Sequence, residues 1–348
     1  MDCLTNPFRG TGLAHPALDD MPWPAADPAP TLALLTRCPR HTVTPMVQAA
    51  ALAKAAGVAE VWFKDERTRM GLGSFKALGA ANVIAHDGVA GRAQGRTYVA
   101  ASAGNHGLSV AAGAAAFGAR ARIFLAETVP EGFADRLRAE GAEVVRAGAT
   151  YEESMAAAET SVRDGGAVLL SDSSWRGYAR IPHLLMEGYL ALMDEAAAQI
   201  GAPPTHVFLQ AGVGGLAAAG AAFVRREWGD GPVICIVEPA AALALAGSIA
   251  AGAPTTSTGP VSIMGRLDCK EPSLIALKGL ARDADHFLTI TEDEAQAATD
   301  RVAAAGLPST PSGAAGLAGL LCAGPHAGTL GLDGTSRVLA ILTEQAEA

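Results

Sequence analysis

The feature that most constrains this chain is a regular alternation of short apolar segments with longer helical patterns. Apolar runs of strand length recur at 60–64, 97–101, 121–125, 142–146, 168–170, 206–210, 232–237 and 337–342. Because short buried strands that alternate with helices form parallel sheets covered on both faces, the sequence predicts an α/β fold. There are more of these units than one core accommodates, so we expect two lobes, each a mostly parallel sheet with helices on both faces.

Composition excludes several classes of function. The 348 residues carry 26 Lys and Arg against 35 Asp and Glu, a formal net charge of −9, and contain no basic run that would bind nucleic acid. The longest bland run, 108–119, is too short to span a membrane, and the N-terminus has no apolar leader. The five dispersed cysteines favour reduced thiols in the cytoplasm, and neither they nor the histidines have the spacing of metal ligands.

Some segments are predicted only in outline. Residues 1–45 are rich in proline and should form an irregular surface segment. The apolar pattern predicts a helix over 45–56 and a single long helix over 178–200. The cationic pair Arg225-Arg226 is typical of a solvated helix face.

A lysine at the start of a predicted helix is the first candidate for chemistry. Ser74 is a suitable helix N-cap, and an apolar helical run follows over 77–84. The helix dipole and desolvation both disfavour an ammonium there, so Lys76 should lose its proton easily. A lysine that forms a Schiff base needs this property. On this stretch alone, a solvated helix lysine is the alternative.

Two further stretches each join a predicted strand to a predicted helix. Residues 102–107 read Ser-Ala-Gly-Asn-His-Gly, in which small residues permit close approach to a ligand and Asn105 offers a donor and an acceptor. Residues 210–216 read Gln-Ala-Gly-Val-Gly-Gly-Leu, and the backbone N–H groups of such a loop bind phosphate at a helix N-terminus. Ordinary tight turns are the alternative for both stretches.

The second of these loops also fits a dinucleotide site. Gly212-x-Gly214-x-x-Ala217 follows a strand, and Glu238 ends the next one. That interpretation leaves Lys76 and the Asn105 loop without a function. One phosphate, a Schiff-base lysine and an asparagine beside a ring account for all three stretches, and together they describe pyridoxal 5'-phosphate. We predict that cofactor and keep an NAD-dependent dehydrogenase as the less favoured alternative.

In order and spacing, these three stretches resemble the fold-type II pyridoxal-phosphate enzymes related to threonine dehydratase and tryptophan synthase β. The chain is most similar to diaminopropionate ammonia-lyases within that group, and the likeness covers nearly its whole length. The motifs that carry this closer likeness are Asn-Pro-Phe at 6–8, Lys-Asp-Glu at 64–66, Ser-Asp-Ser-Ser-Trp-x-Gly-Tyr at 171–178, Met-Glu-Gly-Tyr at 186–189 and Gln-Ala-Gly-Val-Gly at 210–214.

The resemblance implies a homodimer of two-lobed subunits with the cofactor in a cleft between the lobes. We assign a small domain to 81–189 and a large cofactor-binding domain to 1–80 with 190–348. By the same likeness, Lys76 bonds to the cofactor and removes the substrate α-proton, and Asn105 lies beside the ring 3-oxygen. Asp172 is an acidic catalytic residue near the substrate, or else a loop aspartate that caps a turn. The residues around the phosphate are Gly212, Val213, Gly214, Gly215 and Leu216.

Two positions depart from the family pattern. Ala103 stands where the ammonia-lyases carry an aspartate associated with D-substrates, and a methyl group cannot transfer a proton. The last strand leads into Thr-Glu-Gln at 343–345, where the family has a Thr-Glu-Gly-like turn. Ser312 and Thr343 are therefore both candidates for the partner of the ring nitrogen. A neutral hydroxyl there makes the ring a weaker electron sink, which favours prompt loss of a β-leaving group.

These features predict a lyase that performs α,β-elimination on a small β-substituted L-amino acid and releases ammonia and a 2-oxo acid. The expected substrate is 2,3-diaminopropionate. The alternative within the same fold is a dehydratase of L-threonine, L-serine or another 3-hydroxy amino acid. A catalytically silent cofactor-binding module is less favoured, because Lys76 and Asn105 are both intact.

Overall fold

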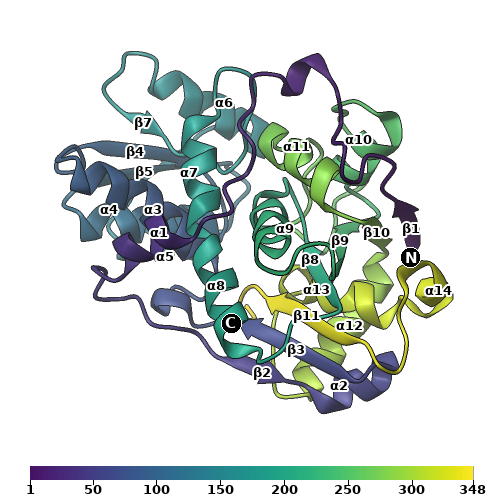
Figure 1. Cartoon of the computed structure of the whole chain (residues 1–348). Helices are drawn as coiled ribbons and strands as arrows, with labels where there is room; N and C mark the ends of the chain where they lie inside the picture. Colours follow the sequence, from purple (N-terminus) through teal and green to yellow (C-terminus); the bar gives the residue numbers. More distant parts are fainter. Residues whose placement is uncertain (348) are drawn as a thin grey trace.

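The computed structural model describes residues 1–347 and contains two β-sheets with helices on both faces of each (Figure 1). The larger sheet has seven strands, in the order β1 (Asp2–Thr5), β10 (His286–Ile290), β9 (Val233–Pro239), β8 (His206–Gln210), β11 (Arg337–Leu342), β3 (Glu60–Asp65) and β2 (Met46–Gln48). Its edge strands β1 and β2 run antiparallel to their neighbours, and the other pairs are parallel. The smaller sheet has four parallel strands, in the order β6 (Glu143–Arg146), β5 (Arg120–Leu125), β4 (Thr97–Ala101) and β7 (Val168–Leu169). The predicted two-sheet α/β fold is confirmed.

The α-helices of the described chain connect and cover these strands. They are α1 (Ala29–Leu35), α2 (Ala50–Ala56), α3 (Lys76–Val89), α4 (Asn105–Ala116), α5 (Glu131–Ala139), α6 (Tyr151–Ser161), α7 (Arg180–Gly188), α8 (Leu190–Gln199), α9 (Gly215–Trp228), α10 (Ala244–Ala251), α11 (Leu274–Asp283), α12 (Glu292–Ala304), α13 (Pro311–Leu321) and α14 (Ala327–Leu330). No helix within residues 1–347 combines the length and apolar character needed to cross a membrane.

Strand β8 shows how the layers of the larger sheet form. Val207 and Leu209 belong to the same buried cluster as residues of α9 and α11, whereas Phe208 packs with residues of α13. Successive side chains of a strand point to opposite faces, so a strand that is apolar throughout is buried only if helices cover both faces. The smaller sheet is built in the same way, with α3 and α4 on one face and α6 on the other.

The buried core is continuous between the two sheets. One cluster contains Ile123 of the smaller sheet, Leu78 and Ile84 of α3, and Leu209 of the larger sheet. The strands of the smaller sheet lie between residues 97 and 169, and those of the larger sheet lie outside 81–189. The division into 81–189 and the remaining residues stays a prediction, and its first boundary falls inside α3.

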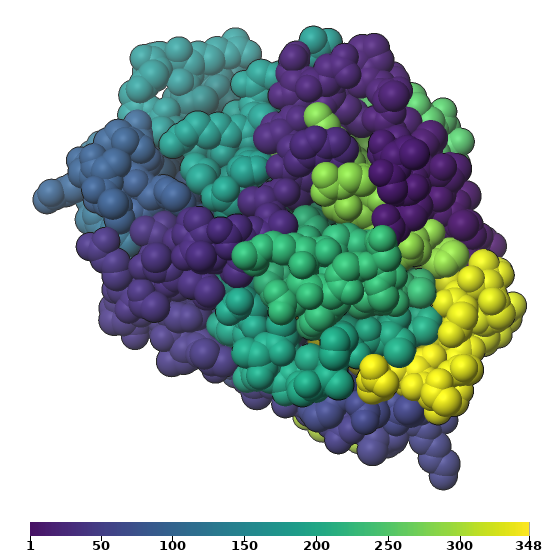
Figure 2. All heavy atoms as spheres, in the orientation of Figure 1, coloured from purple at the N-terminus to yellow at the C-terminus, as the bar shows by residue number. Residues whose placement is uncertain are grey.

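Three local predictions are wrong. The N-terminal segment is not wholly irregular, because β1 and α1 form there. The helix predicted over 45–56 is shorter, because its first residues form strand β2 at the edge of the larger sheet. The long helix predicted over 178–200 is two helices, α7 and α8, which meet at Tyr189. Residues 1–45 do run along the surface, and Figure 2 shows this purple segment on the outside of the molecule.

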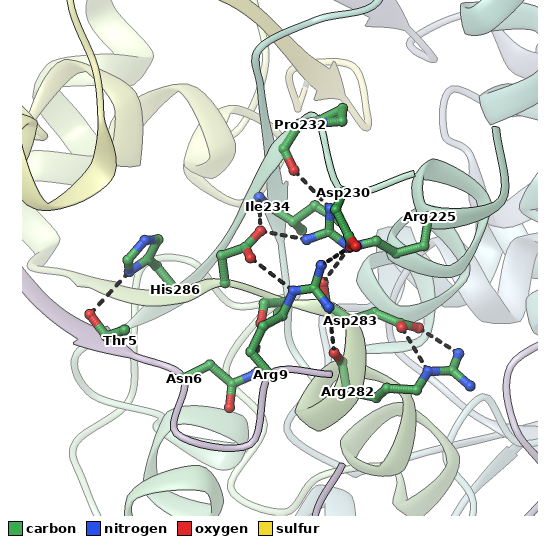
Figure 3. A network of polar contacts seen from close by, with 12 residues as sticks. Thr5, Asn6, Arg9, Arg225, Asp230, Pro232, Ile234, Arg282, Asp283 and His286 are labelled. Atoms are coloured by element: carbon green, nitrogen blue, oxygen red, sulfur yellow. Dashed lines mark hydrogen bonds and ion pairs between the residues drawn. The ribbon is translucent and has the colours of Figure 1, made fainter. Parts of the chain in front are cut away.

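A network of polar contacts fastens the N-terminal segment to the larger sheet (Figure 3). Asn6 Nδ2 donates to the Ala281 and Ala284 carbonyls at 2.9 and 2.7 Å, which caps the end of α11. Asp285 accepts from Arg9 at 2.9 Å and from Arg225 at 2.5 Å. Arg225 is therefore a mostly buried ion-pair partner, and its prediction as a solvated residue is wrong. The Asn-Pro-Phe motif has a structural role here.

Candidate functional site

Lys76 is the first residue of α3, and the chain reaches it through a tight turn. Met70 and Gly73 have φ of +52° and +78°. A Cβ added to Gly73 would lie 2.6 Å from the exposed Gln345 side chain, which can move, so the turn requires glycine chiefly for its backbone conformation. Ser74 Oγ accepts a hydrogen bond from the Lys76 amide at 3.2 Å, although Phe75, one residue later than predicted, occupies the cap position.

Lys76 forms an ion pair with Asp172. Lys76 Nζ lies 2.5 Å from Asp172 Oδ2, and 22% of each side chain is exposed. Burial disfavours both charges, but the attraction between the two groups outweighs it. The pKa of Lys76 is consequently raised above its ordinary value, and the pKa of Asp172 is lowered below its own. The expectation that Lys76 loses its proton easily is wrong for the cofactor-free protein.

The segment that carries Asp172 is anchored at both ends. At its start, the Ser171 amide donates to Tyr178 Oη at 3.0 Å, and that hydroxyl donates to the Leu169 carbonyl at 2.8 Å. Two residues after Asp172, Ser174 Oγ lies 2.7 Å from Ser273 Oγ and accepts from the Ile275 amide at the start of α11. Asp172 is thus held between the end of β7 and the larger lobe.

Asn105 is the first residue of α4, and its side chain contacts a carboxylate that the sequence analysis did not consider. Asn105 Nδ2 donates to Glu344 Oε2 at 2.5 Å. Glu344 Oε1 also accepts from the Thr310 hydroxyl, and Arg266 Nε lies 3.1 Å from Oε2. Glu344 pairs through its backbone with Ser74, two residues before Lys76. The Asn105 and Lys76 loops therefore meet at one residue, the first through the Glu344 side chain and the second through its backbone.

The loop 212–216 joins β8 to α9 and approaches the same place. A Cβ added to Gly212 would lie 2.9 Å from Cys269 Sγ, and Gly214 has φ of +99° and equally close neighbours. A Cβ on Gly215 would lie 3.8 Å from the Tyr189 ring and 4.0 Å from the Asp172 carbonyl oxygen. With Val213 and Leu216, these residues form a glycine-rich turn at a helix N-terminus, where the first N–H groups have no acceptor in the helix.

Ser312 and Thr343 are both buried and lie near the Gln210 side chain. The Ser312 hydroxyl accepts from the Arg266 amide at 3.2 Å, and the Thr343 hydroxyl accepts from Gln210 Nε2 at 3.3 Å. Each hydroxyl keeps a proton that it can donate. Both residues stay candidates for the ring nitrogen.

Four residues that the sequence analysis did not single out lie at this site. Tyr189 packs on the Phe75 ring at 4.9 Å between centroids, is 1% exposed, and its hydroxyl has no hydrogen-bond partner within residues 1–347. Burial lowers the pKa of His106, whose Nε2 lies 2.8 Å from the Leu170 carbonyl oxygen. Burial also raises the pKa of Cys269 to about 12. The fourth residue is Glu344. The position of Tyr189 in a quoted motif was its only sequence signal.

Glu238 does not have the role that a dinucleotide site would give it. Its carboxylate accepts from the amides of Leu245 and Ala246 at 2.8 and 2.7 Å, at the start of α10. The side chain is fully buried, and both of its oxygens are hydrogen-bonded to this helix end. It is therefore not free to bind a ribose hydroxyl.

The fold and the site correspond to one family of known proteins. Residues 38–344 match the pyridoxal-phosphate dependent enzymes, and the chain belongs to this family. The cofactor is accordingly pyridoxal 5'-phosphate, as predicted, and the family resemblance is confirmed.

Within the family, the chain is similar to diaminopropionate ammonia-lyases. It is 31% identical to the enzyme of Salmonella typhimurium, over 90% of this chain and 87% of the relative. The Escherichia coli enzyme in complex with D-serine has a TM-score of 0.87 and 27% identity, over 99% of this chain and 93% of that one. The serine dehydratase-like protein of Mus musculus is 30% identical over 76% of each chain. The names of these relatives describe enzymes that act on small amino acids.

The residues present fit pyridoxal phosphate. The crowded glycines at 212 and 214 flank Val213 in a glycine-rich turn at the N-terminus of α9, which suits a phosphate group. Lys76 keeps part of its side chain exposed next to Asp172. The unpaired Tyr189 hydroxyl is a buried donor that a bound group can satisfy.

Proposed function

We propose that this enzyme eliminates the β-amino group of 2,3-diaminopropionate and releases ammonia and a 2-oxo acid. The observation that carries the proposal is the contact between Lys76 and Asp172. It joins the lysine expected to hold the cofactor to a carboxylate that can bind a second ammonium. A β-ammonium is the group that distinguishes diaminopropionate from serine, so an ionised carboxylate beside the reactive lysine suits the diamino acid. The similarity to diaminopropionate ammonia-lyases supports the same substrate.

Each residue has a separate proposed role. Pyridoxal phosphate, when bound, withdraws electrons from the substrate α-carbon. Lys76 bonds to the cofactor and accepts the substrate α-proton, and Asp172 holds the β-ammonium, which leaves as neutral ammonia. Asn105 donates to the ring 3-oxygen, and Ser312 or Thr343 donates to the ring nitrogen. The amides of Gly212, Val213, Gly214, Gly215 and Leu216 bind the phosphate.

A substrate screen on the purified holoenzyme tests this proposal. We expect ammonia and 2-oxo acid from L-2,3-diaminopropionate at a higher kcat/KM than from L-serine or L-threonine. Borohydride should bleach the yellow protein, and mass spectrometry should find the reduced adduct on Lys76. Adduct on Lys64, or no release from any β-substituted amino acid, would contradict the assignment.

A dehydratase of 3-hydroxy amino acids is the second candidate. The similarity to the serine dehydratase-like protein favours it, as does Ala103, which removes a carboxylate from the loop before Asn105. The screen distinguishes the two reactions by the ranking of L-serine against L-2,3-diaminopropionate.

We also propose a cytoplasmic homodimer whose subunits divide into 81–189 and the remaining residues. The free state of all five cysteines agrees with a reducing compartment. Sedimentation equilibrium should give twice the chain mass of 35.2 kDa. A monomer at micromolar concentration would contradict the dimer.

A further inference from the structure

A buried carboxylate behind the Asn105 side chain has no assigned role in the reaction. Glu344 is 3% exposed, yet its carboxylate contacts residues from three different segments. We propose that Glu344 is a positioning residue, which orients the Asn105 amide toward the cofactor ring. The inference deepens the proposed function, and it rests on the proposed contact between Asn105 and the ring 3-oxygen.

The orientation follows from the donors of a carboxamide. An asparagine carries two N–H donors on one nitrogen, and an ionised carboxylate only accepts. The 2.5 Å contact between Asn105 Nδ2 and Glu344 Oε2 therefore fixes which end of the amide is the nitrogen. It also occupies one N–H and leaves the other available. Without Glu344, the amide can turn its oxygen toward the ring oxygen, where two acceptors would repel.

Burial raises the pKa of Glu344, while the Arg266 guanidinium and hydrogen bonds from Thr310 and Asn105 oppose that shift and hold the carboxylate in place. The Thr310 hydroxyl donates to Oε1, and the Arg266 guanidinium lies beside Oε2 at 3.1 Å. The Ser309 hydroxyl donates to the Glu344 carbonyl at 2.6 Å. A Cβ added to Gly313 would lie 2.9 Å from Glu344 Cγ, so the neighbouring helix leaves this side chain little freedom.

Glu344 also links the two loops that the reaction uses. Its backbone pairs with Ser74, and its side chain contacts Asn105 of the smaller lobe. A shift of this carboxylate would therefore move Asn105 relative to Lys76. A group that acts in this way changes the electronic state of the bound cofactor as well as the rate.

The experiment compares Glu344→Ala, Glu344→Gln, Asn105→Ala and the double variant Asn105→Ala/Glu344→Ala. Two properties of the holoenzyme are measured, namely the apparent Kd of the cofactor by equilibrium dialysis and the pH midpoint of its visible absorption band. Glu347→Gln is the matched control, because Glu347 binds the same Arg266 at 2.7 Å but is 70% exposed.

We expect Glu344→Ala to raise the Kd about tenfold or more, the scale of one charge-assisted hydrogen bond, and to move the absorption midpoint. The double variant should behave like Asn105→Ala, because the two residues act through one contact. Glu344→Gln should shift both properties less than Glu344→Ala does, since the glutamine carbonyl still accepts from Asn105. Glu347→Gln should match the parent protein.

The other outcomes would overturn either the positioning role of Glu344 or the ring contact of Asn105. If Asn105→Ala shifts both properties and neither Glu344 variant does, the positioning role is wrong and the role of Asn105 stands. Additive shifts in the double variant would likewise overturn the coupling. If Asn105→Ala has no effect, its proposed contact with the ring is wrong, and the role of Glu344 is wrong with it.

Discussion

At the scale of single residues, the charge state of Lys76 is decided by one neighbour. Position at a helix start and burial both favour the neutral amine, but Asp172 at 2.5 Å reverses that preference. The two residues are 96 positions apart in the chain. The charge of Lys76 therefore depends on a carboxylate that is distant in sequence.

Replacing Asp172 tests both halves of this pair. In Asp172→Asn, the Lys76 ammonium loses its partner, so its pKa should fall and cofactor uptake by the apoprotein should begin at lower pH. Turnover should drop by about a hundredfold to ten-thousandfold, the usual contribution of an acid–base group. Stopped-flow absorbance across pH measures uptake, and Asp164→Asn, an exposed loop carboxylate, is the control. Unchanged uptake and unchanged kcat/KM would reduce Asp172 to a loop residue.

The exposed methyl group of Ala103 leads to a stereochemical prediction. Removal of the α-proton from a D-amino acid needs a base on the ring face opposite Lys76, and the family resemblance assigns that base to position 103. Loss of a general base costs about 3–5 kcal/mol in barrier. The D-enantiomer of 2,3-diaminopropionate should therefore react at least about a hundredfold more slowly than the L-enantiomer. Coupled 2-oxo acid assays give both values of kcat/KM, and equal values would mean that another residue supplies the second base.

At the scale of elements, a buried ion network holds the connection from β3 to α3. Arg69 pairs with Glu66 and Glu195 at 2.7 Å each, and Lys64 pairs with Glu195 at 2.7 Å. Arg69, Glu66 and Lys64 are fully buried, and Glu195 is nearly so. Glu195 belongs to α8, so the network holds the segment between β3 and Lys76 against this helix. Lys64 and Glu66 of the Lys-Asp-Glu motif have this structural role, whereas Asp65 pairs with Arg67.

Arg69→Met should destabilise the fold strongly. The change leaves the carboxylates of Glu66 and Glu195 buried with too few partners, which typically costs about 3–5 kcal/mol. Thermal unfolding of the apoprotein should show a clear fall in Tm, and cofactor affinity should weaken with it. Arg138→Met, which breaks an exposed pair with Glu131, should leave Tm nearly unchanged. Equal effects of the two substitutions would mean that burial of the network does not matter.

At the scale of the whole molecule, paired carboxylates occur in each part of the structure. Asp87 of the smaller lobe is nearly buried and accepts from Arg92, Arg96 and Tyr98. Burial raises the pKa of Asp87, but these donors lower it by more, so the pKa lies below its ordinary value of 3.8. The pKa of Glu195 is likewise lowered from 4.5 by its cations. The continuous core joins both regions into one folded body.

These shifts make the fold sensitive to acid. The folded protein binds fewer protons at Asp87 and Glu195 than the unfolded chain, so this stability is present above the unfolded pKa values and lost as pH falls toward the folded ones. We expect Tm to decrease as the pH is lowered from about 5 to about 3. Asp87→Asn should lower Tm at pH 7 and change it less at pH 3, as measured by calorimetry, with Asp164→Asn as the control. An Asp87→Asn effect that does not depend on pH would remove Asp87 from this account.

The boundaries of strands and helices followed local patterns and were largely predictable. Strands 97–101, 206–210 and 337–342 form where their apolar runs indicated, because a fully buried strand needs side chains that suit both faces. The edge strands β1 and β2 were missed, since an edge strand with one neighbour has a weaker apolar pattern. The inner strand β10 and the helices α10 and α11 were not predicted either. The break at Tyr189 was missed because both flanking helices have the same period.

The sequence alone determined the fold class and the cofactor, and it predicted the three loops expected to bind it, because strand period, loop glycines and motif order are local properties. Tertiary structure decided the electrostatics of the site. The ion pair of Lys76 with Asp172 and the contact of Asn105 with Glu344 span 96 and 239 residues. A charge acts through distance in space, and only the folded chain brings such distant residues within hydrogen-bonding reach.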